Sequence, residues 1–181
     1  MARTVSITKE SLLAAAFELT AREGKASLTA RKLAVEAGCS TQPIFRVYKS
    51  MDELTEEVFA MAIDYFGKFC AEYQASSDVP FVNLGMAYIS FAQQNKELFR
   101  MLFVSEERYG RSLYELLNGS NGFVKEQIIY AAKLGCKNPE DLFMKMWMFI
   151  HGSACMSLTD DYDLDVTATK TLLEETEKVF A

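Results

Sequence analysis

Two polar side chains, Gln42 and Arg46, lie one helical turn apart in a stretch that is otherwise mostly small or apolar. A glutamine amide can pair with N6 and N7 of adenine, and an arginine guanidinium can pair with guanine or hold a phosphate. Their spacing places both on one side of a helix. Both could equally be ordinary solvated side chains, so the helices that carry them must indicate whether they bind DNA.

The segment 28–54 contains two short amphipathic helices joined by a tight turn. The first is predicted to run up to Ala37 and to end at Gly38, because that position favours a residue that tolerates positive φ. Ser40 is the predicted N-cap of the second. Pro43 falls in its first turn, where a missing N–H has no intrahelical acceptor to lose. This arrangement is typical of a DNA-reading helix-turn-helix, although two packed helices can also be plain structure.

The second short helix is expected to have an inward and an outward side. Ile44 and Phe45 can turn inward, and Tyr48 can pack near the helix end. Four side chains then remain to face outward or sideways: Thr41, Gln42, Arg46 and Val47.

Charge is unevenly distributed along the chain. It carries 19 Lys and Arg against 25 Asp and Glu, a formal charge of −6, which is unlike a generic nucleic-acid binder. Residues 1–50 nevertheless hold eight basic and four acidic side chains, whereas the remainder holds 11 and 21. A basic N-terminal module on an acidic body suits one face held to phosphates while the rest is repelled.

Composition predicts an all-α protein. Half the residues are hydrophobic, Gly and Pro are scarce, and no run alternates like a sheet. No apolar stretch approaches the roughly 20 residues that span a bilayer, and no signal peptide is recognisable, so a cytoplasmic protein without a membrane partner is expected. The four cysteines lack the paired spacing of a zinc or redox motif, so no metal or cofactor is expected; they are Cys39, Cys70, Cys136 and Cys155.

Capping signals mark the predicted helices. Thr8 can cap the first, Ser50 with Glu53 forms a capping box, and Asn138-Pro139 is a strong start signal. Beyond the two short helices, the predicted helices run over 8–24, 50 to about 74, 78 to about 94, 98–103, from about 106 to 118, 124–134, from 139, and from 165 to the end. The helix from Ser50 joins two predicted domains directly: a helix-turn-helix domain over 1–50, with three helices, and a helical effector-binding and dimerisation domain over 51–181.

The chain resembles the TetR/AcrR family of one-component transcription regulators. Within the first 55 or so residues, the matching positions agree in order and spacing with the family pattern: Thr29, Ala37-Gly38, Cys39-Ser40, Ile44-Phe45, Tyr48 and Leu54. Softer likenesses to ligand-binding domains of one branch of the family follow in Phe91 to Phe103 and in Trp147 to Gly152.

This resemblance implies a homodimer whose two recognition helices enter successive major grooves of a pseudo-palindromic site in double-stranded DNA. The last two helices are the candidate dimer face, and repression is the commoner outcome in the family. With the basic residues of the module, the resemblance gives a predicted DNA-contact set: Arg3, Thr29, Arg31, Ser40, Thr41, Gln42, Arg46, Tyr48 and Lys49.

Three positions depart from the family pattern. The family usually has Tyr where this chain has Phe45, His or Tyr where it has Val47, and Lys where it has Met51. Each usual side chain can donate a hydrogen bond to phosphate, so weaker clamping of the DNA backbone is expected. Lys49, Arg46 and an arm at Arg3 could replace part of it.

A small-molecule effector is the second expected partner. Aromatic and methionine side chains suit an adaptable apolar pocket, although such stripes are also ordinary core. His151 could likewise hydrogen-bond a ligand or be a satisfied core histidine. The candidate lining residues are Met61, Tyr65, Phe69, Tyr88, Phe91, Phe99, Tyr109, Tyr114, Met144, Trp147 and His151.

An enzyme is not expected, because a single histidine and no nucleophile arrangement leave little for catalysis. The acidic stretch 160–165 lacks the central glycine and final glutamate of a calcium loop, so it is interpreted as a helix-capping turn. The alternative to a regulator is a helical dimerisation or interaction protein with a weakened DNA-binding head, suggested by Phe45, Val47 and Met51.

Overall fold

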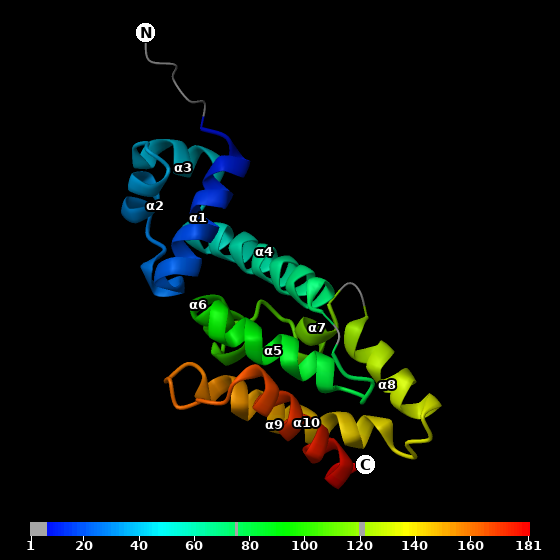
Figure 1. Ribbon diagram of the computed structural model, residues 1–181. Coiled ribbons are helices and arrows are strands. Elements are labelled where there is room, and N and C mark those ends of the chain that lie inside the picture. The colour runs from blue at the N-terminus through cyan, green and yellow to red at the C-terminus, as the bar shows by residue number, and fades with distance from the viewer. Residues whose placement is uncertain (1–6, 75, 120–121) are drawn as a thin grey trace. The chain divides into compact units, whose positions relative to one another are not determined.

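The computed structural model describes residues 7–74, 76–119 and 122–181, and across them it is all-α, with no strand (Figure 1). This confirms the predicted fold class. The α-helices are α1 Lys9–Glu23, α2 Ala30–Glu36, α3 Thr41–Val47, α4 Met51–Glu72, α5 Val82–Gln94, α6 Lys96–Phe99, α7 Leu113–Asn118, α8 Phe123–Lys133, α9 Pro139–Met156 and α10 Val166–Phe180. A 3₁₀ turn, η1 (Lys25–Ser27), and a π-helical turn, η2 (Arg100–Val104), complete the elements.

The chain packs as two compact units. The first comprises the residues up to Asp64 with Glu97–Arg111, and the second comprises Tyr65–Lys96 with Ser112–Ala181. The long helix α4 contributes residues to both. The functional division into 1–50 and 51–181 stays a prediction, because compact packing and function need not share a boundary.

In the first unit, the helix-turn-helix forms from local signals. The Thr8 hydroxyl accepts from the Ser11 N–H at 3.1 Å and begins α1. Gly38 has φ +63°, and the N–H groups of Gly38 and Cys39 return to the carbonyls of Val35 and Ala34. This is a Schellman termination, as the predicted end of the helix at Gly38 requires.

Two predicted starts differ in the structure. The Ser50 hydroxyl accepts from the Glu53 N–H as predicted, but the Glu53 carboxylate accepts from Lys49 N–H at 2.7 Å, so the reciprocal bond is displaced by one residue. The helix expected from about Glu106 begins only at Leu113, because Tyr109 (φ +52°) and Gly110 (φ +77°) turn the chain first. A capping box of Ser112 and Glu115 then starts it.

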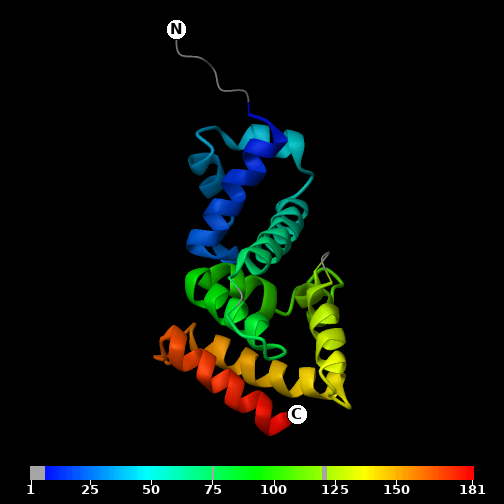
Figure 2. The ribbon, with the colours of Figure 1, turned by 45° about the vertical axis from the view of Figure 1, so that its right-hand side comes forward.

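In the second unit, α5 packs against α9 and α10, and the last two lie side by side (Figure 2). Gly85 sits at this packing: a Cβ there would lie 2.9 Å from Cδ1 of both Ile150 and Leu173. A glycine therefore permits the close approach of three helices. Among the described residues, no helix is long and apolar enough to cross a membrane.

Candidate nucleic-acid interface and ligand pockets

The recognition helix α3 presents one polar side and one buried side. Thr41, Gln42 and Arg46 are exposed, as predicted, and Ile44 is fully buried. Phe45 was expected to turn inward, and that prediction is wrong: its side chain is 53% exposed. In a helix of seven residues the inward stripe is narrow, and Ile44 with the following Tyr48 already occupies it.

Tyr48 lies in the interior of the unit. Its packing at the helix end is confirmed, with 1% exposure, and its hydroxyl donates to Glu57 Oε2 at 3.1 Å. Lys9 Nζ pairs with the other oxygen of Glu57 at 2.5 Å. Burial, reinforced by Glu57, raises the pKa of the Tyr48 phenol. Tyr48 therefore joins the end of α3 to α4, and its predicted contact with DNA stays a prediction.

The basic side chains of this unit fall into two groups. Arg22 forms a two-pronged pair with Glu36 at 3.1 and 2.7 Å, and Lys32 pairs with Glu23 at 2.8 Å. By contrast, the exposed side chains of Arg31, Arg46 and Lys49 form no ion pair within the described part of the chain. These three belong to the predicted DNA-contact set, and their charges remain available to phosphates.

The remaining residues of the predicted DNA-contact set differ in where they lie and in the bonds that they make. Thr29 is the N-cap of α2 and accepts from the Lys32 N–H at 3.3 Å. Ser40 occupies the N-cap position of α3, as predicted, but its hydroxyl makes no capping bond. Arg3 lies outside the described residues. Val47 and Met51, two of the departures from the family pattern, are half-buried.

In the second unit the predicted effector residues Tyr88, Trp147 and His151 come together. The Tyr88 and Trp147 rings meet edge-on with centroids 5.0 Å apart. The Tyr88 hydroxyl lies 3.0 Å from His151 Nδ1, and Cys155 Sγ lies 3.6 Å from Nε2. Both ring nitrogens thus have partners, which fits the satisfied core histidine more closely than a free ligand contact. Burial raises the pKa of Tyr88 well above its ordinary value, so the phenol keeps its proton.

The other predicted effector residues do not form a single lining. Phe91 is buried and packs against the rings of Tyr65 and Phe69, whereas Tyr114 and Met144 are about half exposed. Met61, Phe99 and Tyr109 belong to the first unit. There the Tyr109 ring packs edge-on against Phe59, 5.1 Å away.

Pockets occur in both units. One of about 500 Å³ has Phe69 in its wall, beside Tyr73 and Gln94. Another, of about 770 Å³ in the first unit, is lined by Tyr109, Lys25 and Met51 among others.

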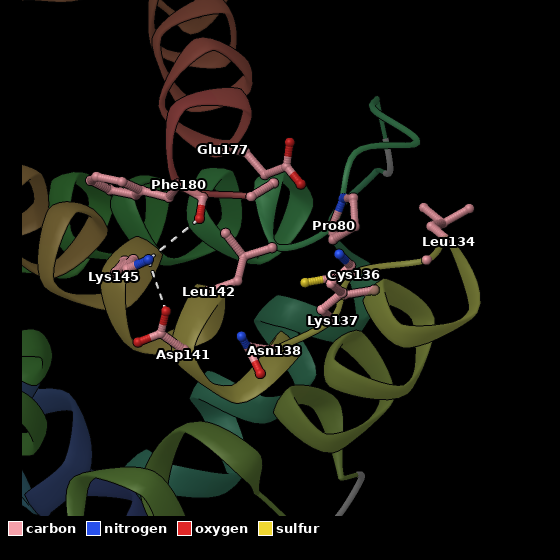
Figure 3. Close-up of a pocket in the computed structure, with 13 residues that line it drawn as sticks. Pro80, Leu134, Cys136, Lys137, Asn138, Asp141, Leu142, Lys145, Glu177 and Phe180 are labelled. Atoms are coloured by element: carbon pink, nitrogen blue, oxygen red, sulfur yellow. Dashed lines mark hydrogen bonds and ion pairs between the residues drawn. The ribbon is translucent and has the colours of Figure 1, made fainter.

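A third pocket, of about 500 Å³, lies in the second unit and contains none of the predicted effector residues (Figure 3). Its wall combines apolar Leu142 and Phe180 with charged Lys145 and Glu177. Lys145 pairs with Asp141 at 2.8 Å, and burial raises the pKa of Glu177. The sequence offered no signal for this pocket, because its walls come from positions about a hundred residues apart at the extremes.

The acidic stretch 160–165 behaves as the predicted capping turn. Asp165 accepts from the Ala168 N–H at 2.8 Å and begins α10, while Asp160 pairs with Lys96. Among the described residues, no three His, Cys, Asp or Glu side chains gather as metal ligands would.

The chain is similar to known proteins in sequence over its first helices and in fold over nearly its whole length. The family described as bacterial regulatory proteins, tetR family, matches residues 12–58. A solved structure from Vibrio parahaemolyticus, assigned to the TetR family of transcriptional regulators, is 20% identical, with a TM-score of 0.68, covering 94% of this chain and 96% of that one. Another assigned TetR-family regulator, from Rhodococcus sp., is 18% identical, with a TM-score of 0.66 and coverages of 94% and 97%.

A third solved structure, a TetR-family member from Streptomyces coelicolor A3, is 16% identical, with a TM-score of 0.62 and coverages of 92% and 96%. No curated protein matches the chain. At these identities the solved structures support the fold, and the match over 12–58 identifies the helix-turn-helix.

Proposed function

We propose that this chain, which belongs to the TetR family of bacterial transcriptional regulators, is a dimeric repressor of a pseudo-palindromic operator that a small apolar or amphipathic molecule releases. TetR-family proteins are DNA-binding regulators and not enzymes. The observation that carries the proposal is the outward side of α3, where Gln42 and Arg46 are exposed while Ile44 anchors the opposite side.

The proposed division of labour follows from chemistry. Gln42 and Arg46 read base edges, while Arg31 and Lys49 hold phosphates. The Tyr48–Glu57 bond holds the C-terminal end of α3 against α4. Thr29, Ser40 and Thr41 remain proposed contacts through their hydroxyls, and Arg3 through the N-terminal arm.

Self-association through α9 and α10 is supported by what these helices leave uncovered. Met144, Met148 and Met156 are 51%, 62% and 48% exposed and recur at multiples of four residues along α9. On α10, Val166 and Val179 are 71% and 81% exposed. A two-fold pairing of the two helices would remove part of this apolar surface from water and double the DNA contacts.

The proposed effector binds in the second unit, near the aromatic group of Tyr88 and Trp147. Rings and methionines there can adapt to an apolar ligand, and the Tyr88 phenol supplies a polar group. The ligand would shift α4 and thereby the reading helices, by no more than its difference in affinity for the two states.

The deciding experiment incubates the protein with fragmented genomic DNA of its source at moderate salt and sequences what is retained. We expect enrichment of a short two-fold-symmetric site, lost in Gln42→Ala with Arg46→Ala although thermal unfolding is unchanged. Exposed Gln93 and Lys133, in the second unit, give a matched control pair of alanine substitutions that should retain the site. Equal retention of all DNA, or of none, would favour the interaction protein with a weakened head.

Dimerisation and effector binding have separate readouts. Met148→Asp should shift the sedimentation coefficient toward that of a monomer and weaken operator binding. Trp147 is the only tryptophan of the chain, so its fluorescence reports on the proposed effector region alone. A compound that releases the operator without changing this fluorescence would bind elsewhere, and the pocket of Figure 3 would be tested next.

A further inference from the structure

An apolar ring stands in the middle of the reading face. Phe45 follows Thr41 by four residues and Gln42 by three, so it lies on the same side of α3 as these two. Its side chain is 53% exposed. Within the described residues it makes no ring stacking and no cation–π contact.

The exposure of Phe45 leaves apolar surface in water that a bound partner can cover. The side chains around it determine which partner that is, because Gln42 and Arg46 are suited to base edges and phosphates. Phenylalanine cannot donate a hydrogen bond to a phosphate. Among the groups that line the major groove of DNA, the apolar one is the 5-methyl group of thymine.

We propose that Phe45 determines sequence specificity by packing against the 5-methyl group of a thymine in each half-site. The inference rests on the proposed DNA-reading function. It gives Phe45, which has no part in the proposed polar contacts, a base to recognise. An apolar contact of this kind discriminates thymine from cytosine at one position without any hydrogen bond.

The test uses synthetic duplexes of the site enriched from genomic DNA, in which each thymine is replaced in turn, in both half-sites together, by deoxyuridine. Deoxyuridine pairs with adenine as thymine does and lacks only the methyl group. At one position the wild-type protein should bind about 15-fold more weakly. The replacement removes two methyl groups, one from each half-site, and each buried methyl group contributes about four-fold to affinity. Elsewhere the replacement should change affinity less than two-fold.

Phe45→Ala should bind the thymine site more weakly and lose the sensitivity, so that thymine and deoxyuridine duplexes bind alike. Phe45→Leu, which keeps an apolar side chain, should retain part of it. The matched control is Ile129→Ala in the second unit, where the side chain is 46% exposed and the full sensitivity should persist.

The outcomes separate the two ideas. If a site is enriched but no thymine shows the effect, or if Phe45→Ala keeps it, the assignment of Phe45 is overturned while the regulator stands. If no site is enriched at all, both are overturned. A sensitivity that disappears in Phe45→Ala and persists in Ile129→Ala supports the inference.

Discussion

The two compact units hold their helices together by different means. In the first, polar tethers supplement the apolar core: Tyr48 and Lys9 both bond to Glu57, and Arg22 of α1 pairs with Glu36 of α2. In the second, ring contacts and a close approach of three helices join the helices, as at Tyr88, Trp147 and Gly85.

The difference follows from size and task. The helices α2 and α3 have only seven residues each, so polar bonds between defined atoms add to what fixes the direction of α3. Reading bases needs such fixed geometry. Met86 and Met146 are buried in the second unit, and methionine side chains adapt readily, which suits a unit proposed to accept a ligand.

The largest effect is expected from overfilling the second unit. Gly85→Leu introduces a side chain where even a Cβ would come within 2.9 Å of Ile150 and Leu173. The free energy of unfolding should fall by about 3 kcal/mol or more, since α5, α9 and α10 must separate. Urea unfolding measures this.

The control is Gly67→Ala in α4, where a Cβ would meet no atom within 4 Å. It should stabilise the protein by up to about 1 kcal/mol through helix propensity. A Gly85→Leu variant as stable as the wild type would remove the contrast drawn between the units.

An intermediate effect is expected from cutting the tether in the first unit. Tyr48→Phe removes the hydroxyl bonded to Glu57 and keeps the buried ring. Unfolding free energy should fall by about 1 kcal/mol, the usual contribution of such a bond, and operator affinity should fall further than stability alone accounts for. Hydrogen exchange of the α3 amides should quicken.

Tyr114→Phe serves as the comparison, because Tyr114 is 45% exposed in the second unit. It should leave stability and α3 exchange unchanged. Equal behaviour of the two variants would mean that the tether does not orient the recognition helix.

The smallest effect concerns the surface pair of α1 and α2. The Arg22 guanidinium lowers the pKa of Glu36 below its ordinary value of 4.5. Because the folded pKa is the lower one, the stabilisation is present above the unfolded pKa and is lost as pH falls through the folded pKa. In Glu36→Gln the free energy of unfolding should therefore fall less steeply as the pH is lowered. Added salt should weaken the Arg22–Glu36 pair in the wild type.

Glu18→Gln is the matched control, since Glu18 is an exposed glutamate of α1 with no ion pair among the described residues. Its acid profile should follow that of the wild type. If Glu36→Gln does the same, the Arg22 pair contributes nothing measurable to the first unit.

The helices themselves were largely predictable, because their signals are local. Thr8, Gly38 and Asp165 end or begin helices as their residue types and neighbours indicate. The errors occur where tertiary packing overrides such signals. Phe81 adopts φ +64° and delays α5 to Val82, and the turn at Tyr109 replaces a predicted helix start.

The candidate interface was also predictable in part, because the spacing of residues within one helix is a local signal. Helical spacing placed Gln42 and Arg46 together on an exposed side, and the structure shows them there. Spacing alone could not decide which of Phe45 and Tyr48 would be buried, because both are aromatic and both lie near the edge of the inward stripe. In the structure Tyr48 is the buried one, and Glu57, nine residues further on, accepts its phenol hydrogen bond.

By itself, then, the sequence determined the all-α class, the helix-turn-helix and the polar residues of its reading side. These depend on hydrogen bonds and periodicities that close within a few residues. Only the tertiary structure decided that Phe45 faces solvent, that Tyr48 is a tether, and that His151 meets Tyr88 across 63 positions of sequence. Each of these outcomes depends on competition among distant side chains for the same interior space, which no local pattern records.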